Sequence, residues 1–183
     1  ETEELVDWII KDTKGDCLNI LDVCSGSGCI SLSLSHAFQN AHVHGYELSK
    51  DAIELSEENA LALKLPLAFE CVDVLDFEQF TSALNKKTKA GLLDIVVSNP
   101  PYIPHQEKAS MEDVVLKHEP AMALFVPDED PLLFYRKIAE GIFPFLSTSG
   151  VLYFECHYLY LENTRNFLLE LGFTHVEKRK DLQ

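Results

Sequence analysis

The chain has 183 residues, of which 46% are hydrophobic and 25% are charged, so it suits one ordinary globular domain with a full hydrophobic core. Its formal net charge of −15 excludes a broad basic surface for nucleic acid, since such affinity comes largely from Lys and Arg that neutralise phosphates. No apolar run reaches about 18 residues, which excludes an ordinary membrane-spanning helix. We therefore expect a monomeric single domain over 1–183 with neither a nucleic-acid nor a membrane partner.

Strand-like and helical segments alternate along the chain. A helix is predicted over 3–12, with Thr2 as its N-cap. Strands are predicted over 17–23, 42–47, 67–72, 92–97, 150–155 and 173–178. Further helices are predicted over 29–38, 49–64 (capped by Ser49), 77–84, 131–146 (begun by Pro131) and 159–171. This alternation predicts an α/β fold, a Rossmann-like, mostly parallel, doubly wound sheet.

A long irregular segment, from Tyr102 to about Asp130, follows the fourth predicted strand. It includes a predicted helical piece over 111–117. A loop of this length inside a compact domain is more often functional than structural. Glu119 in this loop has two interpretations, as the lip of a pocket or as an exposed carboxylate.

The Cys, His and Lys patterns predict no special site. The five cysteines form no CxxC pair, and three lie in apolar runs, which favours small buried side chains in a reducing compartment. His42 and His44 share one face of a predicted strand, but without a third ligand nearby we expect no metal. The basic runs at 86–89 and 178–180 are interpreted as solvated surface.

Residues 24–28, the glycine turn, join the first predicted strand to its helix in the pattern Asp22-x-Cys24-x-Gly26-x-Gly28. Glycines let the backbone pass close to a ligand, and the following helix offers free amide donors. Ser31 stands where the dinucleotide fingerprint needs its third glycine, which disfavours a pyrophosphate cofactor.

Two carboxylates close the next two predicted strands. Glu47 follows the glycines by about 20 residues, where a carboxylate binds two ribose hydroxyls. Asp73 ends the third strand beside the same crevice, where it faces an adenine edge. Either acid alone is explained better as a turn former than as a binding residue. Together with the glycine turn they predict a pocket for an adenosine without a pyrophosphate, and S-adenosylmethionine fits it best.

Residues 98–102, Ser98-Asn99-Pro100-Pro101-Tyr102, form what we call the clamp loop. They follow a buried strand, at whose carboxyl end an open α/β sheet binds ligands. The paired prolines stiffen the backbone, and the Asn99 amide both donates and accepts hydrogen bonds. The loop is thus predicted to be a binding site with a rigid amide clamp; a simple Pro-terminated strand and turn is the alternative.

Together these segments resemble the class I methyltransferases, and among them the HemK/PrmC family of protein glutamine N5-methyltransferases. The residues that carry the resemblance are 1–5 (ETEEL, the end of a PRPETE segment), 20–34 (ILDVCSGSGCISLSL), 97–103 (VSNPPYI), 118–124 (HEPAMAL) and 130–135. The resemblance implies methyl transfer from S-adenosylmethionine to the glutamine of the GGQ motif in a peptide-chain release factor, a step that serves translation termination.

The resemblance also implies roles for individual residues. The methionine part of the cofactor would contact Asp22, Cys24, Ser25, Gly26, Ser27 and Gly28. Glu47 would bind its ribose, and Asp73 and Val74 would border its adenine. In the clamp loop, the Asn99 side chain, which also borders the cofactor, and the Pro100 carbonyl would accept hydrogen bonds from the substrate amide. Pro101 and Tyr102 would wall that pocket.

The chain departs from the family pattern at several points. Cys24 replaces the usual first glycine and, in a left-handed backbone, would cost energy. Val74 replaces a residue that is aromatic in some relatives, and 155–157 (ECH) replaces an ExG pattern. The family's helical N-terminal domain and last strand are expected to be missing from this chain, which begins without Met. The divergent turn favours a mitochondrial member, in the matrix; a bacterial or cytoplasmic one is the alternative.

Two rival functions share these motifs. A methyltransferase for N6 of adenine in DNA or N2 of guanine in RNA would clamp a similar planar amine, but the net charge and the lack of a target-recognition domain oppose it. A non-catalytic scaffold that kept the fold is opposed by the largely intact glycine turn, Glu47 and clamp loop.

Overall fold

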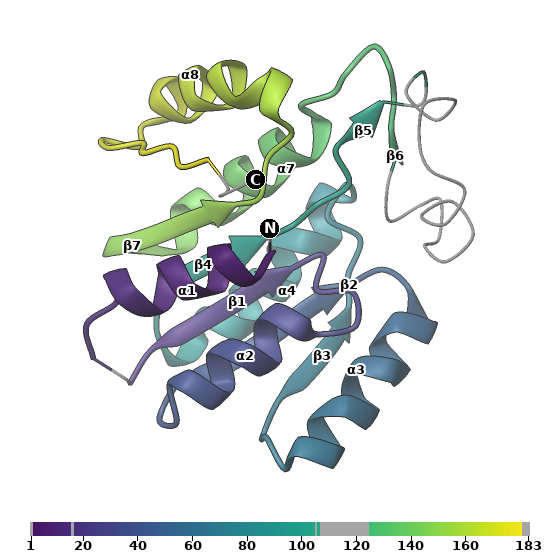
Figure 1. Cartoon of the computed structure of the whole chain (residues 1–183), viewed down its shortest axis with the longest axis vertical. Helices are drawn as coiled ribbons and strands as arrows, with labels where there is room; N and C mark the ends of the chain where they lie inside the picture. The colour runs from purple at the N-terminus through teal and green to yellow at the C-terminus, as the bar shows by residue number, and fades with distance from the viewer. Residues whose placement is uncertain (1, 16, 105, 107–124, 181–183) are drawn as a thin grey trace.

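A five-stranded parallel sheet forms the centre of the structure, a computed structural model that describes residues 2–15, 17–104, 106 and 125–180 (Figure 1). The strands lie in the order β3-β2-β1-β4-β7, and each neighbouring pair runs parallel. The chain therefore starts in the middle of the sheet and winds out to both edges, as predicted. The strands are β1 (Asn19–Val23), β2 (His42–Glu47), β3 (Ala68–Cys71), β4 (Leu93–Ser98) and β7 (Leu146–Phe154).

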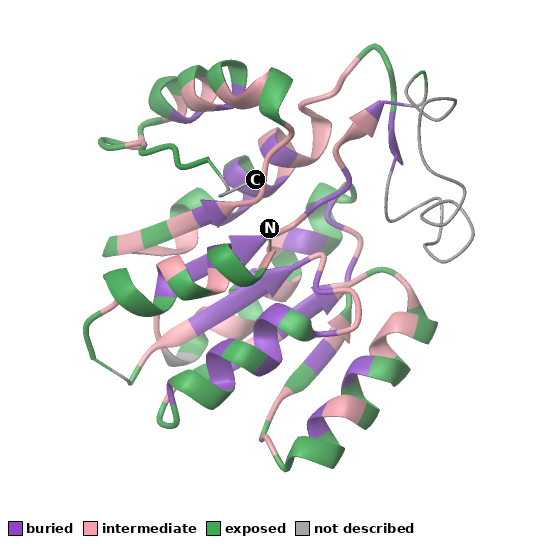
Figure 2. Ribbon diagram, viewed as in Figure 1, coloured by how far each residue is buried: buried purple, intermediate pink, exposed green. Residues whose placement is uncertain are grey.

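Helices cover both faces of this sheet. Successive residues of β1 enter opposite cores, because side chains alternate along a strand: Ile20 packs with α1 and α2, and Leu21 with α4 and α7. Figure 2 shows β1 and β4 almost wholly buried, while the outer faces of the helices are exposed. The helices are α1 (Thr2–Asp12), α2 (Cys29–Ala37), α3 (Lys50–Leu63), α4 (Phe77–Lys87), α7 (Leu133–Ile142) and α8 (Leu161–Leu171).

Most of the predicted elements are confirmed to within a few residues. The strand predicted over 42–47 coincides with β2. The helix predicted over 49–64 is α3, and Ser49 is its N-cap, accepting a hydrogen bond from the backbone N–H of Ala52 at 3.3 Å. The helix predicted over 77–84 continues to Lys87.

The helix predicted over 131–146 is wrong at both ends. The α-helix begins two residues after Pro131 and ends at Ile142, where a short 3-10 turn, Phe143–Phe145, leads into β7. Pro144 explains the early end, because proline has no N–H to donate to the carbonyl four residues earlier and its ring clashes with that carbonyl in an α-helix. The last strand of the sheet consequently begins four residues earlier than predicted.

The predicted sixth strand, over 173–178, is also wrong. No strand forms there, and most of the segment is exposed. Its two apolar anchors, Phe173 and Val176, lie three residues apart, which does not fit the two-residue period of a half-buried strand. Phe173 instead packs against Phe143, with ring centroids 5.1 Å apart.

The structure also revises the role of Thr2. Thr2 is the first residue of α1 and not its N-cap, and its hydroxyl donates to Glu155 at 2.7 Å. Two short strands, β5 (Ile103–Pro104) and β6 (Phe125–Val126), were not predicted; they pair in parallel. The helical piece predicted over 111–117 and Glu119 lie outside the described residues.

The cysteines are less buried than predicted. Cys17 and Cys71 are exposed, and Cys156 is half-buried. Cys17 is exposed because β1 begins two residues after it, and Cys71 because it ends an edge strand. Among the described residues there is no group of three His, Cys, Asp or Glu side chains placed to hold a metal ion, and no helix long and apolar enough to cross a membrane.

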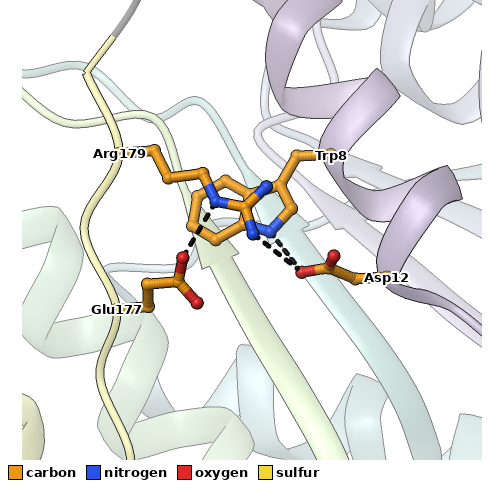
Figure 3. A network of polar contacts seen from close by, with 4 residues as sticks. All are labelled: Trp8, Asp12, Glu177 and Arg179. Atoms are coloured by element: carbon orange, nitrogen blue, oxygen red, sulfur yellow. Dashed lines mark hydrogen bonds and ion pairs between the residues drawn. The ribbon is translucent and has the colours of Figure 1, made fainter.

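The two ends of the described chain are joined by one cluster of side chains (Figure 3). The Arg179 guanidinium lies 4.0 Å from the ring centroid of Trp8 in α1. It also pairs with Asp12 at 3.4 Å and with Glu177 at 2.9 Å. Trp8 also makes an edge-to-face contact with Tyr153 of β7, at 5.6 Å between centroids. These contacts hold α1 against the sheet.

Candidate functional site

The carboxyl ends of β1, β2 and β4 meet at one edge of the sheet. Val23, the last residue of β1, pairs with Tyr46 of β2 on one side and with Ser98 of β4 on the other. The buried Ser98 hydroxyl donates to the carbonyl oxygen of Val23 at 2.6 Å. The glycine turn (24–28) and the clamp loop (98–102), which follow these strands, therefore start side by side.

Left-handed backbone defines the glycine turn. The φ angles are 60° at Cys24, 54° at Gly26 and 81° at Gly28, so Cys24, although not a glycine, adopts the left-handed conformation at a cost of about 1–2 kcal/mol. A Cβ on Gly28 would lie 3.0 Å from the ring of Phe69. A Cβ on Gly26 would meet nothing within 4 Å, so Gly26 faces open space from which a ligand can approach its backbone.

Glu47 connects the glycine turn to the beginning of α3. Its Oε2 accepts a hydrogen bond from the backbone N–H of Gly26 at 2.8 Å. Its Oε1 accepts from the backbone N–H groups of Leu48 at 2.8 Å and Ser49 at 2.9 Å. Each carboxylate oxygen has two lone pairs, so the Oε2 of the half-buried Glu47, with one donor, retains capacity for a ligand hydroxyl. Glu47 thus already lies beside the turn with which it was predicted to act.

Asp22 lies beneath the turn and is fully buried. Its Oδ2 accepts hydrogen bonds from the backbone N–H of Ser31 at 3.1 Å and from the Ser31 hydroxyl at 2.6 Å, which ties β1 to α2. Its Oδ1 is buried with no partner among the described residues. Burial raises the pKa of the Asp22 carboxyl to about 7, although the hydrogen bonds from Ser31 lower it. No sequence pattern indicated that Ser31, interpreted only as a missing glycine, is the hydrogen-bond partner of Asp22.

The pKa of the Cys24 thiol shows that several acidic side chains lie near it. Burial raises the pKa of its thiol, and the charges of Glu47, Asp22 and Asp73 raise it further. Asp22 and the two predicted strand-end acids, Glu47 and Asp73, therefore all act on one side chain, at the beginning of the turn. Such a thiol stays protonated at neutral pH, so Cys24 is no nucleophile.

Of the two residues predicted to border an adenine, Asp73 is partly exposed and Val74 is buried. The half-buried Asp73 accepts a hydrogen bond from the backbone N–H of Leu75 at 2.9 Å. Val74, only 5% exposed, packs into the core and leaves little surface for a ligand. Two apolar side chains missed by sequence reasoning are exposed instead: Leu48, directly after Glu47, at 46%, and Leu75 at 39%. Their positions, one residue after Glu47 and two residues after Asp73, were the available signal.

In the clamp loop, Pro100 and Pro101 are buried, whereas Asn99 and Tyr102 are partly exposed. Buried prolines fix the backbone, so the carbonyl of Pro100 and the side chain of Asn99 have little freedom to move. The Asn99 Nδ2 donates to the Thr2 hydroxyl oxygen at 3.4 Å. Figure 1 shows the beginning of α1, near the N label, close to the end of β4.

Glu155, directly after β7, is a second neighbour of the clamp loop that sequence reasoning noted only as a departure from the family. Its backbone N–H donates to the carbonyl of Ser98 at 3.0 Å. Its side chain accepts from Thr2 at 2.7 Å and from the Tyr102 hydroxyl at 3.5 Å. Its carbonyl accepts from the buried Tyr135 hydroxyl at 3.4 Å. Its place at the carboxyl end of a predicted strand was the available signal.

A parallel sheet of this order, with a left-handed glycine turn after its first strand and an acid closing its second, defines the class of Rossmann-like methyltransferase folds. Solved structures show the same architecture. The ribosomal protein L11 methylase from Lactobacillus delbrueckii matches with a TM-score of 0.65 at 18% identity, over 98% of this chain and 72% of that one. TrmN from Thermus thermophilus matches with 0.55 at 20% identity, over 82% and 35%. The predicted fold class is confirmed.

The chain belongs to the methyltransferase small domain family, which it matches over residues 2–119. It is also similar to curated release factor glutamine methyltransferases. It is 43% identical to that of Bacteroides thetaiotaomicron over 184 residues and 39% identical to that of Flavobacterium psychrophilum over 186. In both cases the match covers 100% of this chain and 62% of the relative's length.

Proposed function

We propose that this chain is a single S-adenosylmethionine-dependent methyltransferase domain that methylates the side-chain N5 of the glutamine in the GGQ motif of a peptide-chain release factor. The names of the relatives support the substrate. The observation that carries the proposal is the placement of the Asn99 and Pro100 acceptors directly beside the glycine turn, through the hydrogen bond between Ser98 and Val23.

The residues at the glycine turn fit the cofactor. The open space over Gly26 allows a ligand to reach the backbone of the turn, and Glu47 lies within hydrogen-bond distance of that backbone. In this assignment the turn and Asp22 hold the methionine part, Glu47 the ribose, and Asp73 with the exposed Leu48 and Leu75 the adenine. When bound, the cofactor supplies a methyl group on a sulfonium.

The chain's own residues then have an orienting task. A carboxamide nitrogen is a poor nucleophile because its lone pair is delocalised into the carbonyl. The Asn99 Oδ1 and the Pro100 carbonyl accept its two hydrogens and direct the lone pair to one side of the amide plane. Tyr102 walls the pocket. Positioning of this kind is a large part of the catalysis of an in-line transfer.

A labelling experiment tests the proposal. The chain is incubated with methyl-labelled S-adenosylmethionine and with bacterial or mitochondrial release factors, and the modified residue is mapped by mass spectrometry. We expect one methyl on the GGQ glutamine and none on a factor in which that glutamine is replaced by glutamate. The preferred factor also tests the mitochondrial location, which rests on the divergent turn at Cys24 alone, against a bacterial cytoplasmic one.

The same incubation judges the rival functions. Label in added DNA or RNA but not in protein would favour the N6-adenine or N2-guanine methyltransferase. Calorimetric titration with the cofactor that shows no binding would favour a scaffold. Size-exclusion chromatography with light scattering tests the monomer that we propose.

A further inference from the structure

Three side chains from distant parts of the sequence meet behind the clamp loop. Asn99 follows β4, Thr2 opens α1, and Glu155 follows β7. The Asn99 Nδ2 lies 3.4 Å from the Thr2 hydroxyl oxygen, which lies 2.7 Å from the Glu155 Oε2. The hydroxyl therefore links an amide to a carboxylate.

The chemistry of these groups allows only one direction for the chain of hydrogen bonds. An ionised carboxylate can only accept, so the Thr2 hydroxyl gives its single hydrogen to Glu155. The Thr2 oxygen is then left as an acceptor, and the only donor on the Asn99 side chain is its NH2 group. The amide must turn its nitrogen toward Thr2 and its Oδ1 away from it.

The direction matters because the two ends of an asparagine amide have nearly the same shape. If Asn99 turned over, its NH2 group would face the incoming substrate NH2, and two donors would oppose one another. Clamping a carboxamide requires the oxygen at that place. Nothing in the prolines of the loop selects between the two orientations.

The carboxylate that sets the direction is itself held in place. The Glu155 backbone N–H donates to the Ser98 carbonyl at 3.0 Å, so β7 carries the carboxylate to the end of β4. Thr2 is held by α1, whose buried Leu5 and Ile9 pack on the sheet. We propose that Thr2 and Glu155 form an orientation lock that presents the Asn99 oxygen to the substrate amide.

The lock makes Thr2 and Glu155 positioning residues for methyl transfer, and it rests on the proposed function for the identity of the substrate. Two substitutions distinguish the orientation lock from a role of Thr2 in packing alone. Thr2→Val keeps the shape and removes the hydroxyl, whereas Thr2→Ser keeps the hydroxyl. Thr164→Val is the matched control, because the Thr164 hydroxyl is buried with no partner among the described residues.

We expect Thr2→Val to lower kcat by roughly 10- to 100-fold with an unchanged Kd for S-adenosylmethionine, and Thr2→Ser and Thr164→Val to stay close to wild type. Glu155→Gln can donate to Thr2 and so turn the hydrogen bonds around. Glu155→Gln should lower kcat about as much as Thr2→Val does. In the Thr2→Val background it should lower kcat little further, because the hydroxyl through which it acts is absent.

A second readout needs no substrate. In ¹⁵N-labelled protein, the Asn99 side-chain NH2 signal, identified by its loss in Asn99→Asp, should exchange slowly in wild type and Thr2→Ser and quickly in Thr2→Val. A Thr2→Val variant with wild-type kcat and wild-type exchange would overturn the lock. A wild-type chain that methylates no release factor would refute the proposed function instead. The hydrogen-exchange rates of the Asn99 side-chain NH2 would still test the lock in that case.

Discussion

The two halves of the site are built in different ways. The glycine turn takes its shape from main-chain conformation, with three left-handed residues within five, and from Glu47 about 20 residues away. The clamp loop takes its shape from side chains brought together over 97 residues, between Thr2 and Asn99, and over 153, between Thr2 and Glu155. The first half is thus nearly contiguous in sequence, whereas the second depends on how the whole sheet is assembled. Variants that affect one half and spare the other test this division.

The largest effect is expected for Asn99→Ala. Removal of the acceptor should lower methyl transfer by roughly 1000-fold, because the substrate amide loses its orientation. Cofactor affinity should change little, and isothermal titration calorimetry beside a radiolabel transfer assay separates the two. Asn85→Ala, on an exposed face of α4, is the control. Near-normal turnover in Asn99→Ala would contradict the clamp.

Glu47→Gln should show the opposite separation. The amide removes a charge that accepts three backbone hydrogen bonds and would bind ribose, so we expect Kd for the cofactor to rise about 10- to 100-fold. At saturating cofactor, kcat should recover most of its wild-type value. Glu57→Gln, exposed on α3, serves as control. A kcat defect that saturation does not relieve would mean that the two halves are not independent.

Alanine at two glycines of the turn should cost unequal amounts of stability. Gly28→Ala adds a Cβ 3.0 Å from Phe69 to a left-handed residue and should lower the free energy of unfolding by about 2–4 kcal/mol. Gly26→Ala meets open space and should cost only about 1–2 kcal/mol. Urea denaturation measures both. Equal losses of unfolding free energy would show that backbone conformation alone, and not packing against Phe69, determines the cost of a side chain in the turn.

Asp22 should affect stability less than Gly28, and in a way that depends on pH. Because burial raises the pKa of its carboxyl from 3.8 to about 7, the folded state prefers the protonated form. This contribution to stability is complete below about pH 4 and is lost as the pH rises to about 7. Asp22→Asn should remove that part of the profile and be more stable than wild type at pH 8 by about 1–3 kcal/mol. Parallel unfolding profiles of the two proteins from pH 4 to 8 would contradict the raised pKa.

The sequence predicted local features well and long-range features poorly. The boundaries of β2 and the Ser49 cap depend on neighbouring residues, and both are confirmed. The helix after Pro131 was predicted too long because Pro144 was overlooked, which is a local signal missed rather than an absent one. The roles of Thr2 and Glu155 could not be predicted, because only the order of the strands brings these residues to the clamp loop.

The contact of Arg179 with Trp8 has a practical consequence. Trp8 is the only tryptophan in the sequence, so the intrinsic fluorescence of the protein excited at long wavelength comes from one ring. That ring contacts both the guanidinium of Arg179 and the ring of Tyr153, and it belongs to the helix that begins with Thr2. Emission from the unlabelled chain therefore reports how α1 is seated on the sheet. A quenching titration with iodide or acrylamide follows that seating in real time while ligands are added at the other end of the same helix.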